Sequence, residues 1–281
     1  MTVPFRLMGI VNVTPDSFSD GGLYLDADAA VAHSRELVAQ GADILDVGGE
    51  STRPGAEPVG AEEESTRVLP VIETLAGDGA AQISVDTSKV AVAERALAAG
   101  ASLVNDVTAF RAEPDLAGLV AASGADCCLM HMLGEPRTMQ HDPRYADVVD
   151  DVKAFLAERL EFAVGEGIAE ERVLLDPGIG FGKTVEHNLE LLRRLDELAA
   201  LGRPLVVGTS RKTFLGRLAA GSPGPEGRLP GTLATNVLAL ERGASVFRVH
   251  DVGPVRDALA VAAATLGSRW TSSRAARSRT T

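Results

Sequence analysis

Polar side chains recur along the chain, each at the end of a short apolar run. These positions are Asn12, Asp46, Asp86, Asn105–Asp106, His131, Asp176, Ser210–Lys212 and His250–Asp251. A single polar residue after a strand often only caps a turn, but the strands of one parallel barrel end at a common rim, where active sites form. The repetition therefore predicts a ring of polar groups around one pocket.

Cationic residues in this ring indicate an anionic ligand. Arg248 and His250 alternate along the last run, so their side chains would share one face of a strand. Lys212 opens a helix-like segment after the seventh run, and Arg53 stands in the long segment after the second. Such groups on a protein of net charge −12 favour an anionic, phosphorylated ligand.

Oxygen-bearing side chains indicate two further kinds of contact. Asn12 with nearby carboxylates suits Mg²⁺, a hard cation that prefers oxygen ligands and water. Asp86, Asn105 and Asp176 would lie deeper, where a carboxylate needs donors such as the adjacent N–H groups of a flat heterocycle. Two structural alternatives stay open: Asp86 could cap the third helix, or Asp176 could hold its own loop in place through hydrogen bonds. The five histidines lack zinc-type spacing, so no transition-metal site is expected.

The segments between these residues repeat one pattern. A helix-like segment ends at a glycine, which is followed by Ala, a small polar residue and an apolar run, as at Gly41, Gly100, Gly124 and Gly243. Glycine suits the left-handed position that ends a helix before a buried strand. Strands are expected near 6–12, 43–48, 82–86, 102–105, 126–131, 172–176, 204–208 and 245–249. Helices are expected near 26–40, 60–77, 88–99, 112–123, 146–167, 185–201, 211–219 with 229–242, and 253–266.

Eight such units in roughly 265 residues favour a single α/β domain, a (β/α)₈ TIM barrel. An open doubly wound sheet would alternate in the same way, but no glycine-rich nucleotide fingerprint supports it. The expected boundaries are 1–267 for the barrel and 268–281 for a disordered basic Ser/Thr/Arg-rich tail. Long segments after the first two strands, 13–25 and 48–60, are interpreted as movable lids.

Composition argues against several classes of partner and location. The acidic net charge argues against nucleic acid, because such partners need a basic surface. The sequence has no stretch of about 20 apolar residues, so no membrane span is expected. The first residues lack the features of a signal peptide. The only two cysteines, Cys127 and Cys128, are expected to be buried core thiols in a reducing compartment. A cytoplasmic protein is therefore expected.

Specific motifs resemble those of the dihydropteroate synthase family from about residue 6 to 265. They are NVTPDSFSDGG (12–22), DVGGESTRPGA (46–56), SVDT (84–87), NDV (105–107), MHMLGEPRTMQ (130–140), LDPGIGFGKT (175–184), GTSRK (208–212) and RVHDV (248–252). The resemblance implies a (β/α)₈ barrel that joins para-aminobenzoate to 6-hydroxymethyl-7,8-dihydropterin pyrophosphate, uses Mg²⁺ and forms a homodimer. Sulfonamides would compete with aminobenzoate. Leu133 departs from the family, which commonly has a polar residue there.

The resemblance also implies roles for individual residues. The pterin would contact Asp86, Asn105, Met130, Asp176 and Lys212. The pyrophosphate would contact Asn12, Arg53, Arg248 and His250, and Asn12 would also ligate the metal. The aminobenzoate would contact Phe18, Thr52, Pro54, Phe181 and Thr213. Asp20, Arg53 and Lys212 would take part in catalysis, whereas Asp46, Asp106 and His131 receive no role.

Two alternatives compete with the synthase. A pterin-binding barrel that transfers a methyl group from methyltetrahydrofolate to a corrinoid protein would share the pterin aspartates, but it needs neither the lid motif at 50–56 nor the RVH motif at 248–250. An inactive pterin-binding homologue would be expected to have lost Arg53 or Lys212, and both are present. The synthase is therefore the preferred hypothesis.

Overall fold

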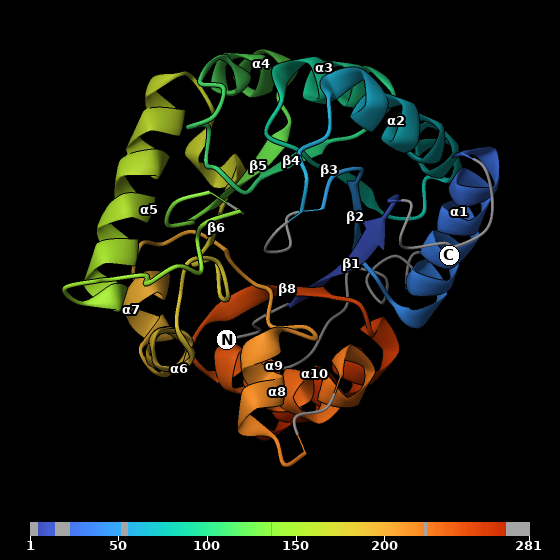
Figure 1. Cartoon of the computed structure of the whole chain (residues 1–281). Helices are drawn as coiled ribbons and strands as arrows, with labels where there is room; N and C mark the ends of the chain where they lie inside the picture. The colour runs from blue at the N-terminus through green and yellow to red at the C-terminus, as the bar shows by residue number, and fades with distance from the viewer. Residues whose placement is uncertain (1–4, 15–22, 52–55, 136, 222–223, 268–281) are drawn as a thin grey trace.

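The computed structural model describes residues 5–14, 23–51, 56–135, 137–221 and 224–267. Within these ranges, parallel strands pair in chain order from β1 to β8, and β8 pairs with β1 to close a barrel. Figure 1 looks along the barrel axis and shows the helices as a ring outside the strands. The predicted (β/α)₈ TIM barrel is confirmed.

The strands match their predicted positions to within one residue at either end. They are β1 (Arg6–Asn12), β2 (Ile44–Gly48), β3 (Gln82–Asp86), β4 (Leu103–Asp106), β5 (Asp126–Met130), β6 (Val173–Asp176), β7 (Leu205–Val207) and β8 (Ala244–Val249). All of the strand pairs are parallel, so the carboxyl ends of the strands lie on one side of the molecule.

The helices also follow the predicted order. They are α1 (Leu23–Gln40), α2 (Ala61–Asp78), α3 (Val90–Ala98), α4 (Asp115–Ser123), α5 (Val148–Gly165), α6 (Val185–Arg193), α7 (Leu195–Ala199), α8 (Thr213–Leu218), α9 (Leu229–Glu241) and α10 (Val252–Thr265). The helix predicted over 185–201 is divided at Arg194, whose backbone leaves the helical region at φ −110° and ψ 29°. None of the described helices is long and apolar enough to span a bilayer.

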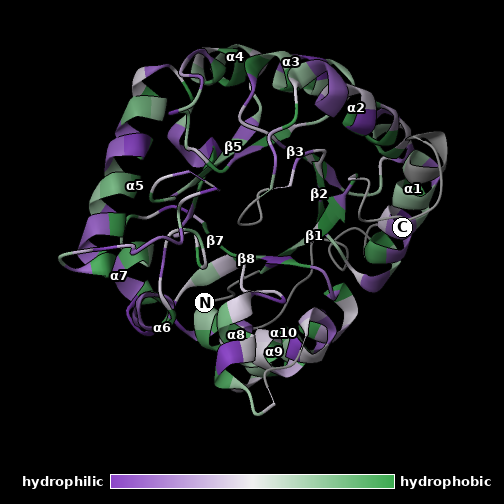
Figure 2. Ribbon diagram, in the orientation of Figure 1, coloured by the Kyte–Doolittle hydropathy of each residue, from purple (hydrophilic) through white to green (hydrophobic). Residues whose placement is uncertain are grey.

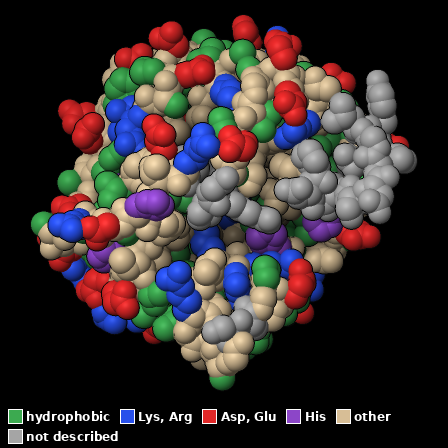
Figure 3. All heavy atoms as spheres, viewed as in Figure 1, with side chains coloured by type: hydrophobic (Ala, Val, Ile, Leu, Met, Phe, Trp, Pro, Cys, Tyr) green, Lys and Arg blue, Asp and Glu red, His purple; other side chains and the backbone are tan. Residues whose placement is uncertain are grey.

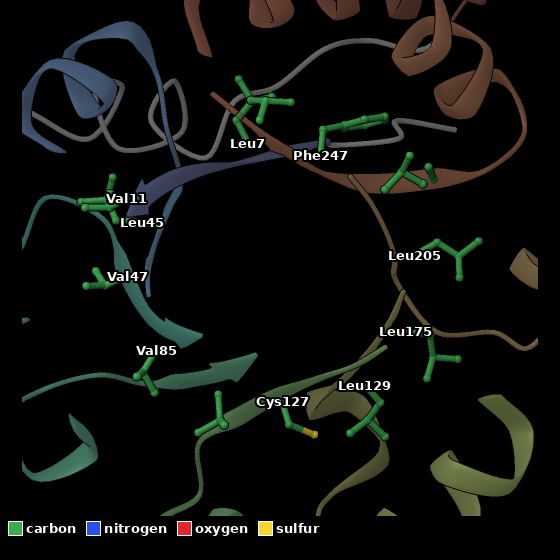
Figure 4. Packing of buried hydrophobic residues seen from close by; sticks show 14 of the residues in the cluster. Leu7, Val11, Leu45, Val47, Val85, Cys127, Leu129, Leu175, Leu205 and Phe247 are labelled. Carbon is green, nitrogen blue, oxygen red and sulfur yellow. The ribbon is translucent and has the colours of Figure 1, made fainter. Parts of the chain in front are cut away.

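Side chains alternate between the two faces of every strand, and this alternation separates the two parts of the core. The residues that point outward pack against the helices, as Leu7, Leu45, Val85, Leu175 and Phe247 do in Figure 4. Figure 2 shows that the strands are largely hydrophobic while the surrounding helices carry hydrophilic residues as well. The opposite positions face the barrel interior, where a compact apolar layer forms from Met8, Ile44, Leu103, Cys128, Leu174, Val206 and Val246.

The glycines of the repeat, Gly41, Gly100, Gly124 and Gly243, all have the predicted positive φ. Gly100 ends the segment after α3 with φ +110°, and a Cβ there would lie 2.6 Å from the Cβ of Ala76. Only glycine reaches this conformation at low cost, so the helix can stop and the chain can turn at once into β4. Cys127 and Cys128 are both buried in β5, as predicted.

Candidate active site

A pocket opens at the carboxyl ends of the strands, above the apolar layer that fills the barrel. Its lining includes nine residues that the sequence singled out: Asp86, Asn105, Met130, Asp176, Phe181, Ser210, Lys212, Arg248 and His250. Ile10, Val107 and Gly208 complete the lining. In Figure 3, which shows the face drawn in Figure 1, Lys and Arg side chains lie at and around the centre of this face. Part of the predicted ring of polar strand ends therefore surrounds one pocket.

Other predicted site residues lie apart from this pocket or outside the described part of the chain. Asn12 ends β1 and is half-buried, on the same face of the strand as the pocket residue Ile10 and closer to the rim. Thr213 is exposed at the start of α8, whose six residues generate only a small helix dipole. Five predicted residues lie outside the described residues, namely Phe18, Asp20, Thr52, Arg53 and Pro54.

One charged network forms the floor of the pocket and joins three strands. The Nε of Arg248 in β8 donates to Oδ2 of Asp46 in β2 at 2.6 Å, and its Nη2 donates to Oδ2 of Asp86 in β3 at 2.7 Å. Burial opposes the charge on Arg248, but the two carboxylates hold the pKa of the guanidinium above its usual range. Asp86 thus lines the pocket. The N-cap of α3 is Lys89 rather than Asp86.

Burial changes the acidity of the pocket's ionisable groups. Desolvation raises the pKa of Asp86 to about 7, although the charge of Arg248 opposes this rise. Desolvation also raises the pKa of Asp176, against the charge of Lys212. The pKa of Lys212 falls to about 8 because burial disfavours the ammonium, with Asp176 opposing the shift. The pocket therefore contains groups that change protonation near neutral pH.

The loop after β6 forms one wall of the pocket, and side chains hold it in place. Oδ1 of Asp176 accepts a hydrogen bond from the backbone N of Gly178 at 2.7 Å, so Asp176 holds its own loop as predicted while it also lines the pocket. The ammonium of Lys212 donates to the carbonyl of Ile179 and lies 4.5 Å from the ring centroid of Phe181. Asp176 and Lys212 thus both line the pocket and order this loop.

Two of the polar strand ends without an assigned role point away from the pocket. Oδ1 and Oδ2 of Asp106 accept from the backbone N–H groups of Thr108 and Phe110, both at 2.7 Å, and thereby shape the loop after β4. His131 Nδ1 lies 2.9 Å from Nζ of the buried Lys183. Both of these side chains have structural partners outside the barrel interior.

Lys183 is a buried cation that sequence reasoning did not single out. Its Nζ contacts His131 and donates to the backbone carbonyl of Phe181 at 3.0 Å, so it links the loops after β5 and β6. Burial lowers the pKa of Lys183, and burial beside this cation lowers the pKa of His131 to about 2. The only sequence signal was its position between the motif glycine Gly182 and the helix cap Thr184.

Potential metal ligands are sparse in the described part of the chain. There, no three His, Cys, Asp or Glu side chains gather in a way that could hold a metal ion. Mg²⁺ often has only one or two protein ligands and keeps waters and substrate phosphates as the others. The side-chain oxygen of Asn12, at the rim above the pocket, fits that mode of binding better than an all-protein cage does.

A family model described as pterin binding enzyme matches residues 8–250. The chain belongs to the pterin-binding enzymes. Among members of this family, dihydropteroate synthase of Escherichia coli (strain K12) is 47% identical over 264 residues, which cover 94% of this chain and 93% of that protein. The matched region includes every residue that lines the pocket.

Solved structures of pterin-binding enzymes support the same assignment. Dihydropteroate synthase of Xanthomonas albilineans with 4-aminobenzoic acid is 48% identical, with a TM-score of 0.88 and coverage of 95% of this chain and 94% of that one. The Yersinia pestis dihydropteroate synthase in a sulfonamide drug complex is 44% identical, with a TM-score of 0.88 and coverage of 94% and 95%. The prediction of a dihydropteroate synthase is confirmed.

Proposed function

We propose that the pocket above the apolar layer is where this chain joins para-aminobenzoate to 6-hydroxymethyl-7,8-dihydropterin pyrophosphate. One observation carries the proposal: Asp86, Asn105 and Asp176 from three strands share a narrow pocket with Lys212 and Arg248. Hydrogen-bond acceptors and cations placed together in this way match a flat ring with several N–H groups that carries an anionic substituent.

The pterin contacts in the proposal follow from chemistry at the pocket walls. A carboxylate of Asp176 or Asp86 accepts two parallel N–H bonds from the 2-amino-4-oxo edge of the ring. The amine of Lys212 donates to a ring acceptor, and Met130 packs on the ring face beside Phe181. These two apolar residues belong to one small cluster with Met132, Met139 and Val107.

The pyrophosphate end of the substrate is proposed to lie toward the rim. Arg248 and His250 point into the pocket from alternate positions of one strand and its continuation, and Nδ1 of His250 lies 3.0 Å from Oγ of Ser210. We assign Asn12 as the protein ligand for Mg²⁺ that accompanies the pyrophosphate. A bound Mg²⁺ would supply positive charge that stabilises the leaving group.

The aminobenzoate is proposed to lie at the mouth of the pocket, against the ring of Phe181 and near Thr213. The bond between the exocyclic CH₂ carbon and the pyrophosphate oxygen breaks, and the arylamine nitrogen forms a new bond to that carbon. The electrons of the broken bond leave with pyrophosphate, and the amine loses one proton to solvent. The proposal also includes the roles predicted for five residues outside the described part of the chain, namely Phe18, Asp20, Thr52, Arg53 and Pro54. It further includes a cytoplasmic location and a barrel domain over residues 1–267.

The direct test is product formation by the purified protein. Incubation with the dihydropterin pyrophosphate, labelled para-aminobenzoate and Mg²⁺ should give labelled 7,8-dihydropteroate and one pyrophosphate per product. A sulfonamide should inhibit competitively with aminobenzoate but not with the pterin substrate. The matched control omits the pterin substrate, which should abolish labelled product.

Three other outcomes would contradict the proposal in different ways. Pterin binding without product would indicate an inactive pterin-binding homologue. Methyl transfer from methyltetrahydrofolate to a corrinoid protein, without dihydropteroate formation, would indicate the methyltransferase alternative. Inhibition by sulfonamide that is competitive with the pterin would contradict the proposed position of aminobenzoate.

A further inference from the structure

Asp46 is a fully buried carboxylate in the middle of the pocket network, and no role has been assigned to it. It lies in β2, two residues before the carboxyl end of the strand, with a relative exposure of 0%. A carboxylate buried in this way is costly unless donors surround it, because burial removes its hydration. The identity of those donors therefore shows what the residue does.

Three side chains from three other strands donate to Asp46. Ser84 Oγ in β3 lies 2.6 Å from Oδ1, while Asn105 Nδ2 in β4 lies 3.0 Å and Arg248 Nε in β8 lies 2.6 Å from Oδ2. An ionised carboxylate only accepts hydrogen bonds, so each partner must turn a donor toward it. Asp46 consequently determines the orientation of all three partners.

The consequence is largest for Asn105, because its amide has one donor end and one acceptor end. With Nδ2 turned toward Asp46, the carbonyl oxygen Oδ1 is the amide atom left to meet a ligand in the pocket. Together with the carboxylates of Asp86 and Asp176, this oxygen makes the wall rich in acceptors. A wall of this kind selects a ligand edge that is rich in N–H donors.

Arg248 is oriented by the same carboxylate. Its Nε is engaged by Asp46 and its Nη2 by Asp86, so the plane of the guanidinium is determined at two points. Such a two-point contact lowers the entropy that the side chain loses when a ligand binds. The pocket is thereby arranged before the substrate arrives.

We infer that Asp46 is a positioning residue that presents Asn105 as a hydrogen-bond acceptor and Arg248 as an oriented cation to the pterin substrate. This inference rests on the proposed function, because it takes Asn105 and Arg248 as contacts of that substrate. Asp46 itself does not touch the reacting atoms. It acts through its two neighbours.

The test compares Asp46→Asn with Ser84→Ala. Asn has nearly the same shape as Asp, but it lacks the charge that pairs with Arg248. It can also turn its own N–H₂ toward Asn105, so the amide of Asn105 is no longer held in one orientation. Asp46→Asn should raise the Kd of 6-hydroxymethylpterin, measured by calorimetry, about ten- to hundredfold. Ser84→Ala removes a donor from the same carboxylate and spares Asn105 and Arg248, so its Kd should change less than about threefold.

A double-mutant cycle separates positioning from a general loss of structure. In an Asn105→Ala background, Asp46→Asn should weaken pterin binding clearly less than it does in the parent, because Asp46 can then act only through Arg248. The KM for aminobenzoate at saturating pterin substrate should stay within about twofold. The melting temperature of each variant, measured in parallel, reports whether it folds.

Each outcome bears on a defined claim. Additive effects of Asp46→Asn and Asn105→Ala, or equal effects of Asp46→Asn and Ser84→Ala, would overturn the inference. If Asp46→Asn does not fold, the inference is judged by Arg248→Lys in the Asn105→Ala background, where additive losses of pterin binding would overturn it. Failure of the parent protein to bind pterin or form product would instead overturn the proposed function.

Discussion

The two pocket aspartates illustrate how neighbours set the chemistry of a single residue. Asp176 receives a backbone N–H from Gly178, whereas Asp86 depends on one guanidinium for its charge compensation. Desolvation raises the pKa of Asp86 to about 7, so the protonation of this carboxyl group changes near neutral pH. A protonated carboxyl group has fewer acceptor sites for the N–H groups of a pterin.

Pterin binding should therefore depend on pH near neutrality. Affinity for 6-hydroxymethylpterin should rise as the pH increases from about 6 to 8, because binding draws the proton from Asp86. Calorimetry in two buffers of different ionisation enthalpy should show net proton release close to pH 7.

The matched control for this prediction is Asp86→Asn, which cannot ionise. This variant should bind pterin weakly and lose the rise in affinity between pH 6 and 7 that Asp86 causes, while retaining any dependence that Asp176 and Lys212 contribute. A parent protein with pH-independent binding between pH 6 and 8 would contradict the raised pKa, and an unchanged slope in Asp86→Asn would assign the proton to another group.

At the scale of elements, the loop after β6 is notable for how closely it approaches the loop after β5. Gly178 has φ +65°, and a Cβ on it would lie 1.8 Å from the backbone oxygen of His131. Lys183 joins the same two loops from the outer side through His131 and the carbonyl of Phe181. The wall that carries Phe181 is thus held from two directions.

Gly178→Ala should test how strongly this approach matters. The added methyl group must displace backbone and occupy a left-handed conformation, so we expect a loss of roughly 2–5 kcal/mol in the free energy of unfolding. The KM for the pterin substrate should rise as well, because Asp176 and Phe181 move with the loop. Chemical denaturation and steady-state kinetics measure the two effects.

Gly118→Ala is the appropriate comparison for that variant. Gly118 is exposed within α4, and no atom lies within 4 Å of the position that an alanine methyl group would take there. Alanine should therefore stabilise the helix by about 0.5–1 kcal/mol. Equal stability changes for the two substitutions would contradict the steric argument.

At the scale of the whole molecule, the helical ring is not uniform on its outer side. Exposed apolar side chains occur on neighbouring helices, with Leu238 on α9 at 43% exposure and Val261 on α10 at 69%. Leu218, the last residue of α8, and Leu266, which follows α10, are exposed as well, and Figure 1 shows α8, α9 and α10 grouped together. We therefore propose that this side is the interface of the homodimer that the family resemblance implies.

Light scattering after gel filtration should give the mass of two chains for the parent protein. Val261→Glu places a charge in the proposed interface and should shift the protein toward the monomer, because burying an unpaired carboxylate is costly. Val164→Glu on α5, where the parent residue is 41% exposed, is the control and should leave the dimer intact. A monomeric parent, or dissociation by both variants alike, would contradict an interface on α9 and α10.

Much of the architecture was determined by the sequence itself. The alternation of apolar runs with helical segments, each ended by a glycine such as Gly100, predicted all of the described strands, because local periodicity and backbone conformation act over short distances. Alternation within one run also placed Arg248 and His250 on the same face. The motifs identified the enzyme family.

Only the tertiary structure decided what the remaining polar strand ends do. Asp46, Asp106 and His131 all follow apolar runs, yet Asp46 points into the barrel interior, where it contacts the pocket residues Asn105 and Arg248, and the other two point toward loops. Which face is interior depends on how the strands pair and how the barrel closes. Asp46 and Arg248 are 202 residues apart in the chain, and they meet because β8 closes against β1 and brings β2 within reach.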